Sequence, residues 1–477
     1  MQLLNWIGLL LATALALGAA SHALLRKSDS RSALGWVAVC LTFPVAGPVL
    51  YILFGVNRVR RSAFRMRRAV HSRSDVDSDQ ILPAEADSVS FPLIPQPFRV
   101  LERVGRNVLG TELIGGNCVE PLFNGDEAYP RMLQAMEGAR QSIYLATYIM
   151  ATDSLGRQFI DVLTRAVRRG VDVRVLVDGL GEKYSWPWAS RALHKNGVAS
   201  ALFIPFRFFP PELHINLRNH RKILVVDGKL GFTGGMNISQ QHVLRAKSFW
   251  PVSDLHFFLR GPVVGQLQEA FVEDWLFATQ ERLTPAPMAP EPMMEDCLCR
   301  TVIDGPDCPH EPLKTLLTGI VSAASSSIKI MTPYFVPPPS FLTALQSARY
   351  RGVDVQIILP GRNNLPFVHW AARHILDHLL RVGISVSYQP APFCHTKLIL
   401  VDGCYVHLGS ANLDNRSLRL NFELTLEVLD LCVAARLERH FEEVRAKSRP
   451  VTRRELHNRS LPVRLRDAFF WLFSPYL

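Results

Sequence analysis

Cysteine is scarce in this chain, with eight residues among 477 and no paired spacing. This scarcity excludes the disulfide-rich scaffolds of small secreted domains. Charged residues are also few, at 20%, whereas 48% of the residues are hydrophobic, which excludes an intrinsically disordered chain. The length is sufficient for roughly three folding units with substantial cores.

Acidic residues are outnumbered, with 42 Asp and Glu against 53 Lys and Arg and a formal net charge of +11. This excess predicts an anionic partner, either a nucleic acid or the phosphate of a lipid head group. Composition alone does not choose between them.

The N-terminus lacks charge altogether: no Asp, Glu, Lys or Arg occurs in residues 1–25. Leu3–Leu25 is long enough to cross a bilayer core of ~30 Å. A second uncharged run, Leu34–Asn57, follows a short polar break and is interrupted by Pro44 and Pro48. We therefore expect a transmembrane hairpin with helices at about 3–25 and 34–57, the second kinked or partly inserted. A cleaved signal peptide is the alternative, but the basic n-region is missing and a second apolar run follows.

A cluster of six arginines at residues 58–68 follows the second apolar run, and no acidic residue lies between that run and Asp75. Such a cluster normally stays on the cytoplasmic side, so the hairpin should enter and leave there and keep the rest of the protein cytoplasmic. A linker that contacts anionic lipids is the other interpretation. The six are Arg58, Arg60, Arg61, Arg65, Arg67 and Arg68.

Two breaks and a repeat organise the remainder. Residues 71–97 suit a linker, and residues 284–312 are too proline-rich for a helix or a central strand. The segment Arg168–Gly179 returns as Tyr350–Gly361, and each copy is typical of a strand, a helix, a Gly turn and an apolar strand. We expect an anchor with its basic segment at 1–70 and two α/β halves at 98–283 and 313–477.

The two halves share a second pattern, H-x-K-x4-D. In each half an asparagine lies seventeen residues beyond the histidine, and a Gly-Gly or Gly-Ser pair precedes that asparagine. Two matches inside two copies of a repeat are not chance. The residues are His220, Lys222, Asp227, Gly235 and Asn237 in the first half, and His395, Lys397, Asp402, Ser410 and Asn412 in the second.

These residue types suit the transfer of a phosphoryl-type group. A neutral imidazole can attack phosphorus and form a covalent intermediate, and a second imidazole can move protons to and from the oxygens. Lysine and asparagine supply donors to the non-bridging oxygens. The apolar runs Ile223–Val226 and Leu398–Val401 predict strands that aim each His and Lys to one side. Because each motif has one histidine, one active site needs both halves.

At these residues the chain resembles the phospholipase D superfamily, whose members carry paired H-K-D motifs. Gly35–Arg58, Arg218–Gly228, Gly409–Glu423 and Ser474–Leu477 are similar to the bacterial cardiolipin synthase branch. The resemblance implies a duplicated α/β/α sandwich with a pseudo-twofold axis, preceded by the transmembrane hairpin, in a bacterial inner membrane. It also implies that a phosphatidyl group passes from one phosphatidylglycerol to another, giving cardiolipin and glycerol.

The resemblance also implies roles for the motif residues. Either His220 or His395 can be the nucleophile, and similar enzymes favour the first. The lysines and asparagines would bind phosphate, with Gly235 and Ser410 beside them, and the two motif aspartates brace the local loops. No metal and no cofactor are expected, the partners are anionic phospholipids rather than nucleic acid, and the oligomeric state stays open.

Two further carboxylates are candidates for orienting the histidines. Asp254 and Glu423 follow the first and second motif histidines by 34 and 28 residues. Histidine catalysis needs an acid on the far ring nitrogen to fix the tautomer. From the resemblance we expect Asp254 to orient His395 and Glu423 to orient His220, the alternative being ordinary surface or N-cap acids.

Other interpretations stay open. The same site with water, serine or another alcohol as acceptor would be a phospholipase or a different phosphatidyltransferase, and a non-catalytic scaffold is disfavoured by two complete motifs. The stretch Arg464–Phe473 could be an amphipathic surface anchor or a core-packing tail. Cys297, Cys299 and Cys308 with His310 match no common zinc spacing.

Overall fold

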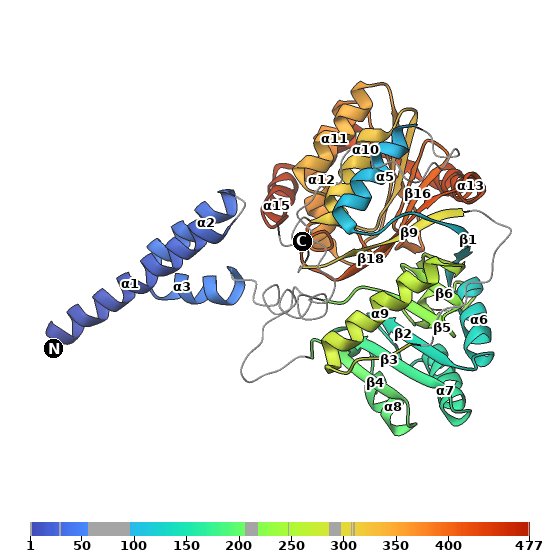
Figure 1. Cartoon of the computed structure of the whole chain (residues 1–477). Helices are drawn as coiled ribbons and strands as arrows, with labels where there is room; N and C mark the ends of the chain where they lie inside the picture. The colour runs from blue at the N-terminus through green and yellow to red at the C-terminus, as the bar shows by residue number, and fades with distance from the viewer. Residues whose placement is uncertain are drawn as a thin grey trace. The chain divides into compact units, whose positions relative to one another are not determined.

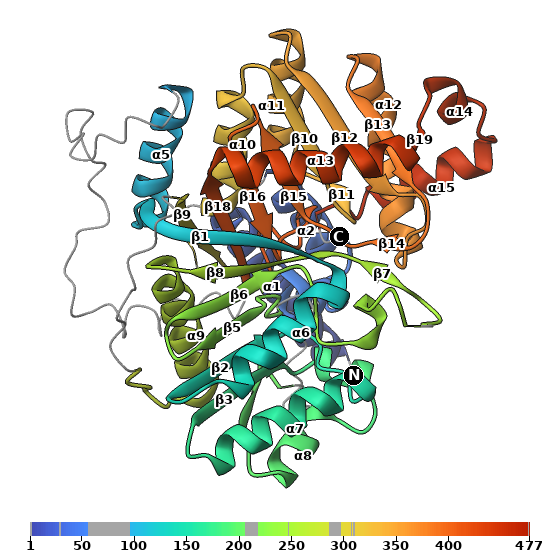
Figure 2. The same ribbon diagram turned by 90° about the vertical axis from the view of Figure 1, so that its right-hand side faces the viewer.

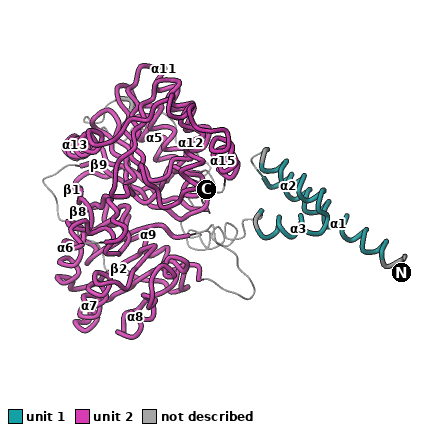
Figure 3. Tube along the Cα trace, turned by 180° about the vertical axis from the view of Figure 1, so that it is seen from behind, with its two compact units in different colours: residues 1–74, 207–213 teal, residues 75–206, 214–477 magenta. Residues whose placement is uncertain are grey.

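The computed structural model describes residues 2–27, 30–55, 96–205, 218–246, 248–285, 297–306, 308, 311–475 and 477. The chain forms two compact units (Figure 3). The first comprises residues 1–74 with 207–213, and the second comprises residues 75–206 with 214–477.

Among the residues that the structure describes, one helix is long and apolar enough to cross a membrane, α1 (Gln2–Arg26) of the first unit. The second apolar run is divided into α2 (Ser30–Thr42), α3 (Ala46–Leu50) and a π-helical turn, Tyr51–Gly55. The division falls at Pro44, so the interruption expected there is confirmed, whereas one helix over 34–57 is wrong. At ~1.5 Å per residue, the 13 residues of α2 reach about 20 Å, less than a bilayer core.

Small side chains let the helices of this unit approach closely. Ala20, Ala23 and Cys40 are buried together with Tyr51, whose hydroxyl lies 2.8 Å from His22 Nδ1. The arginine cluster and residues 71–95 of the expected linker lie outside the described residues.

The second unit is built on one mixed sheet, which has 15 strands in the part of the chain that the structure describes (Figures 1 and 2). Its centre is the antiparallel pair of β1 (Ile114–Phe123) and β9 (Cys297–Asp304). From that pair the same strand order runs outward in both directions. On one side follow β8 (Leu255–Arg260), β6 (Leu230–Gly234), β5 (Ile223–Val226), β2 (Ser142–Thr147), β3 (Asp172–Asp178) and β4 (Ala199–Phe203); on the other β18 (Glu423–Leu429), β16 (Tyr405–Gly409), β15 (Leu398–Val401), β10 (Ser327–Met331), β12 (Asp354–Pro360), β13 (Ser385–Gln389) and β19 (Arg449–Pro450).

The repeated segments occupy equivalent places in this order. Helix α7 (Ser154–Arg168) leads through Gly170 into β3, and α11 (Pro339–Tyr350) leads through Gly352 into β12. Both glycines have positive φ, 83° and 94°, a conformation that side chains with a Cβ rarely adopt. The expected succession of strand, helix, Gly turn and strand is therefore confirmed in both copies.

Helices pack on both faces of each half (Figure 1). In the first half α6 (Asn124–Glu137) and α7 lie opposite α9 (Val263–Thr279), and in the second α10 (Pro312–Ala323), α11 and α12 (Pro366–Arg381) lie opposite α13 (Leu431–Lys447). The main cores lie between the sheet and the first-named helices. The remaining helices are α5 (Gln96–Leu109), α8 (Ala189–Lys195), α14 (Arg453–His457) and α15 (Leu461–Trp471), with 3-10 turns at Gly181–Tyr184 and Gln240–His242.

Two expected boundaries are wrong. Residues 284–312 contain the central strand β9, which pairs with β18 and β1. The prediction was misled because the prolines of this segment lie toward its two ends. No proline occurs between Pro292 and Pro306, and the residues between them are largely apolar, as in a buried strand. Helix α5 was expected in the first half, yet Phe98 packs in the second half's core and stacks on Tyr405 at 5.4 Å between ring centroids.

Candidate active site

Two short backbone pairings join the halves beside the motifs. Strand β7 (Val252–Ser253) runs parallel to β14 (Phe393–Cys394), and Asn219 forms a bridge with Phe422. As a result, the His395 amide donates to Ser253 O at 2.8 Å and the His220 amide donates to Phe422 O at 2.9 Å. The residue after each acceptor is a carboxylate, so each half delivers an acid to the other half's histidine.

Both acids reach the inner ring nitrogen of their histidine. Asp254 Oδ2 lies 2.7 Å from His395 Nδ1, and Glu423 Oε1 lies 3.3 Å from His220 Nδ1. The carboxylate side chains are fully buried, whereas the histidine side chains keep 17% and 19% of their surface exposed. A carboxylate on Nδ1 favours the tautomer with hydrogen there, which leaves the lone pair of Nε2 for chemistry.

A buried arginine ties this arrangement together. Arg221, between His220 and Lys222, pairs through Nη1 with Asp274 of α9 at 2.5 Å. Its Nη2 donates to Asp304 O of β9 at 3.0 Å, and its Nε donates to Glu423 O at 3.1 Å. Three elements from both halves are thus fixed by one side chain, which is 4% exposed.

The motif lysines lie against their own histidines. Lys222 Nζ donates to His220 O at 2.5 Å, and Lys397 Nζ donates to His395 O and lies 2.9 Å from His395 Nδ1. Burial lowers the pKa of each lysine to about 8, although neighbouring carboxylates oppose the shift. Both lysines are thus mainly cationic at neutral pH and are placed to attract an anionic phosphodiester.

The histidines are neutral in the free protein. Burial lowers the pKa of His220 to about 4, with Glu423 opposing. The pKa of His395 lies well below its usual range because of burial and the positive charges of Lys397 and Lys222. Burial would raise the pKa of Glu423, but the interaction and hydrogen bond with His220, the positive charge of Lys222 and a hydrogen bond from Ser410 lower it to about 2. An ionised carboxylate beside a neutral imidazole is the arrangement that a nucleophilic histidine needs.

The motif aspartates lie at the other end of their strands. Asp227 follows β5, about 16 Å along the strand from the motif lysine, and accepts from the amides of residues 140, 141 and 142. Asp402 follows β15 and accepts from the amides of residues 325, 326 and 327 at 2.8 Å. Both have positive φ and precede a glycine in the hairpin turn. They brace the start of β2 and of β10.

Gly235 and Ser410 support the carboxylates. A Cβ at Gly235 would lie 2.4 Å from Asp254 Oδ1, so a larger residue would displace that acid. At the equivalent position Ser410 is 1% exposed and its Oγ donates to Glu423 Oε2. These contacts place both residues directly against the carboxylates, and the substrate contact expected from the sequence stays a prediction.

The two asparagines differ in their surroundings. Asn237 is partly exposed, and its Oδ1 accepts from Ile149 N at 3.3 Å. Asn412 is 4% exposed, and its Nδ2 donates to Ser417 Oγ at 3.3 Å. Among the described residues its Oδ1 has no partner.

Three residues at the site escaped the sequence prediction. The Tyr148 ring lies 4.5 Å from the His220 ring, Asn421 Nδ2 lies 3.2 Å from His220 Nδ1, and the buried His242 ring lies 6.4 Å from that of His395. Without gaps, the alignment of the repeats places Pro333 opposite Tyr148, so none of these three residues had an internal signal in the sequence.

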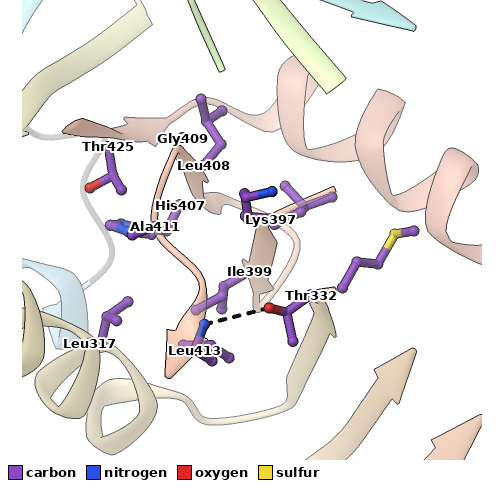
Figure 4. A pocket seen from close by; sticks show the side chains of 12 residues that line it. Leu317, Thr332, Lys397, Ile399, His407, Leu408, Gly409, Ala411, Leu413 and Thr425 are labelled. Atoms are coloured by element: carbon purple, nitrogen blue, oxygen red, sulfur yellow. Dashed lines mark hydrogen bonds between the residues drawn. The ribbon is translucent and has the colours of Figure 1, made fainter. Parts of the chain in front are cut away.

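A small internal pocket lies behind the second motif (Figure 4). Lys397 contributes to its wall, and most of the remaining lining is apolar. His407 also lines it, and neither ring nitrogen of His407 has a partner in the described part of the chain. This pocket therefore lies behind the cluster of motif residues.

Within the described residues, no group of three or more His, Cys, Asp or Glu side chains could hold a metal ion. Cys297, Cys299 and Cys308 are buried free thiols, and His310 lies outside the described residues.

Comparison with known proteins agrees with this geometry. A family model described as the phospholipase D-like domain of cardiolipin synthase matches residues 132–275 and 317–445. A second, described as the N-terminal region of phospholipase D-nuclease proteins, matches residues 14–55.

Similar proteins cover nearly the whole chain. A cardiolipin synthase of Geobacillus kaustophilus is 32% identical over 93% of this chain and 88% of its own length, and the major cardiolipin synthase of Bacillus subtilis is 31% identical over 94% and 95%. The crystal structure of phosphatidylserine synthase from Haemophilus influenzae superposes with a TM-score of 0.63, at 15% identity, over 79% of this chain and all of that one, which shows a shared fold. With both motifs present and both halves matched, the chain belongs to the cardiolipin synthase family of phospholipase D-like proteins.

Proposed function

We propose that this protein is a cardiolipin synthase that transfers a phosphatidyl group from one phosphatidylglycerol to another. The observation that carries the proposal is a pair of histidines, one from each half, each with a buried carboxylate on Nδ1 and a lysine beside it. Relatives that match along the whole chain are cardiolipin synthases, which supports this choice of substrate and product.

In the first step, Nε2 of His220 attacks the phosphorus of phosphatidylglycerol. The bond between phosphorus and the head-group glycerol breaks, and protonated His395 gives its proton to the departing oxygen. An anionic phosphodiester bound beside His395 raises the pKa of that imidazole and so supplies the protonated form. The products are a phosphatidyl-His220 intermediate and glycerol.

In the second step, a hydroxyl of another phosphatidylglycerol attacks the intermediate. His395, now neutral, takes the hydroxyl proton as the oxygen bonds to phosphorus, and the phosphorus–nitrogen bond breaks. Glu423 and Asp254 hold the two rings and stabilise their imidazolium forms, while Lys222 and Lys397 offset the charge on the non-bridging oxygens. Cardiolipin leaves and both histidines return to their starting forms.

We further infer that the two halves are copies of one α/β/α unit related by a pseudo-twofold axis. The mirrored strand order and the matched motif positions support this inference. We also propose that α1 and the segment after it anchor the chain in a bacterial inner membrane as a hairpin, with the catalytic unit cytoplasmic. The length of α1 and the arginines that follow at 58–68 support that topology.

The decisive experiment is analysis of the lipid products. Purified full-length protein in mixed micelles with phosphatidylglycerol should give cardiolipin and glycerol in equal amounts, at the same rate with and without chelator. Phosphatidic acid as the main product would instead mean that water is the acceptor and the protein is a phospholipase. No turnover of any phospholipid would contradict the proposal.

The rate should fall on both sides of neutral pH. Below about pH 4 protonation of His220 removes the nucleophile, and above about pH 8 Lys222 and Lys397 lose the charge that attracts the phosphodiester. The profile of kcat/KM for phosphatidylglycerol tests both limbs. Lys397→Arg should make the basic limb less steep, because the guanidinium stays charged while Lys222 still loses its proton near pH 8. The double variant Lys222→Arg, Lys397→Arg should move the limb upward, and a limb that stays in place in the double variant would assign it to another group.

A further inference from the structure

One face of α15 is fixed to the catalytic unit. Phe470 packs on Trp370 of α12 at 5.0 Å between ring centroids, and Trp471 stacks on His374 at 4.7 Å. Asp467, 1% exposed, accepts hydrogen bonds from Arg373, Arg459 and Arg466. The helix is therefore held in one rotational setting about its axis.

The opposite face presents an apolar stripe to solvent. Its members recur at helical spacing, so they share one side of α15 and of the turn that follows it. A contiguous set of large apolar side chains on a surface indicates a partner, whereas scattered single ones do not. The stripe consists of Leu461, Leu465, Phe469, Leu472 and Phe473, with exposures of 65%, 61%, 54%, 66% and 46%.

A basic pocket lies next to the beginning of α15. Arg373, Lys447, Arg449 and Arg459 line it with one acid, Glu455. Some of this charge is paired internally, since Arg449 forms two hydrogen bonds with Glu455 and Arg373 and Arg459 share Asp467. Lys447 is exposed at the pocket's edge, and the positive groups still outnumber the acids around it.

An uncommitted hydrogen-bond donor lies in the wall of this pocket. Tyr388 is 8% exposed, and its hydroxyl has no partner among the described residues. Burial raises the pKa of Tyr388 to about 12, so the hydroxyl keeps its proton. Arg373 Nε is likewise buried without a partner in the described part of the chain. Cations with spare donors are the groups that bind a phosphate.

We propose that α15 and this pocket form a docking site for a bilayer that contains anionic phospholipids. The stripe enters the boundary between head groups and acyl chains, and the pocket binds the phosphate of one head group. A helix with leucine and phenylalanine on one face and arginines on its flanks suits the surface of a membrane. A protein partner would not require the phosphate site. The docking site lies outside the cluster of motif residues, so its test does not depend on the reaction proposed above.

Quenching by the lipid itself tests the stripe in the full-length protein. A fluorophore is attached at Phe469→Cys in a Cys432→Ser background, and the protein is placed in nanodiscs of phosphatidylcholine and phosphatidylglycerol whose acyl chains carry bromine. The control is the same label on native Cys432 of α13, which covers the other face of the sheet (Figure 1). Cys432 is exposed and the other described cysteines are buried, so labelling is selective.

We expect at least about twofold stronger quenching at position 469 than at 432, and equal quenching at the two positions would overturn the docking site. The stronger quenching should decrease when phosphatidylcholine replaces all phosphatidylglycerol. Tyr388→Phe removes only an unpartnered hydroxyl. This variant should need about threefold more phosphatidylglycerol to reach half of the maximal quenching at position 469. Quenching at position 469 that does not depend on phosphatidylglycerol would overturn the assignment of the pocket to a lipid head group. Loss of that quenching in low millimolar inorganic phosphate would overturn it as well.

Discussion

Replacing His220 with alanine is expected to lower the rate of phosphatidyl transfer by about 10⁴-fold or more, since no other group can form the covalent intermediate. His395→Ala should lower it by about 10²- to 10⁴-fold, the usual contribution of a general acid and base. The double variant should be little slower than His220→Ala alone, because the two residues act in one sequence of steps. Initial rates of cardiolipin formation measure all three.

The assignment of the nucleophile needs its own measurement. His395→Ala slows both formation and release of the intermediate, so labelled phosphatidyl groups should be found on His220 after long incubation, by mass spectrometry of peptides kept under alkaline conditions. Label on residue 395 of the His220→Ala variant would reverse the two roles. His378→Ala is the matched control, because His378 is an exposed histidine of α12 and should change neither rate nor labelling.

The local parts of the site could be predicted from sequence because they are set by short-range geometry. A strand of four apolar residues fixes where His220 and Lys222 emerge, and an Asp-Gly hairpin turn fixes Asp227 at the other end. The internal repeat adds a second, independent example of the same pattern. The two halves of the chain could therefore be compared with each other, which is why the sequence predicts the two motifs and a site that needs both.

Long-range packing defeated the prediction in two places. Helix α5 is contiguous in sequence with β1 of the first half, but its apolar face is complementary to the second half's core, where Phe98 meets Tyr405. Strand β9 lies between proline-rich stretches whose composition dominated the interpretation of the whole segment. Its role as a central strand depends on partners at both sides, β1 and β18, that no local pattern identifies.

The same limit applies to the residues around the histidines. Asn421 reaches His220 only because Phe422 pairs with Asn219 across the halves, a contact between positions about 200 residues apart. His242 approaches His395 through the loop that follows the first motif, and the equivalent position in the second half is Ser417. The internal repeat predicts the residues that the two halves share, whereas Asn421 and His242 occur in one half only.

Replacing the buried carboxylates with their amides is the second change with a large expected effect. Glu423→Gln and Asp254→Asn should each lower kcat by about 10²- to 10⁴-fold with little change in KM, because the amide no longer favours hydrogen on Nδ1 and no longer stabilises an imidazolium. Glu423→Gln should also slow formation of the phosphatidyl-enzyme, whereas Asp254→Asn should slow the proton transfers. Single-turnover kinetics separates these two steps.

Asp402→Asn provides the matched control, because it removes a carboxylate of the same motif that lies at the far end of β15. Partial burial would raise the pKa of Asp402, but its three backbone hydrogen bonds outweigh that effect and hold the pKa below its usual range. The ionised carboxylate therefore stabilises the folded protein above the ordinary pKa of an aspartate. This stabilisation is lost as the pH falls through the lowered pKa. The amide should cost about 1–3 kcal/mol in free energy of unfolding and leave kcat within about twofold. Thermal unfolding and initial rates measure the two effects separately.

The contrast between these variants distinguishes chemistry from architecture. A motif that names His, Lys and Asp together suggests that all three act on the substrate. The structure instead puts the motif aspartate on the backbone of a neighbouring strand and brings a different carboxylate to each histidine from the other half. Near-normal transfer by Glu423→Gln would make that cross-half contact incidental. Equal rate losses in Asp402→Asn and Glu423→Gln, with the protein still folded, would return the motif aspartate to the reaction.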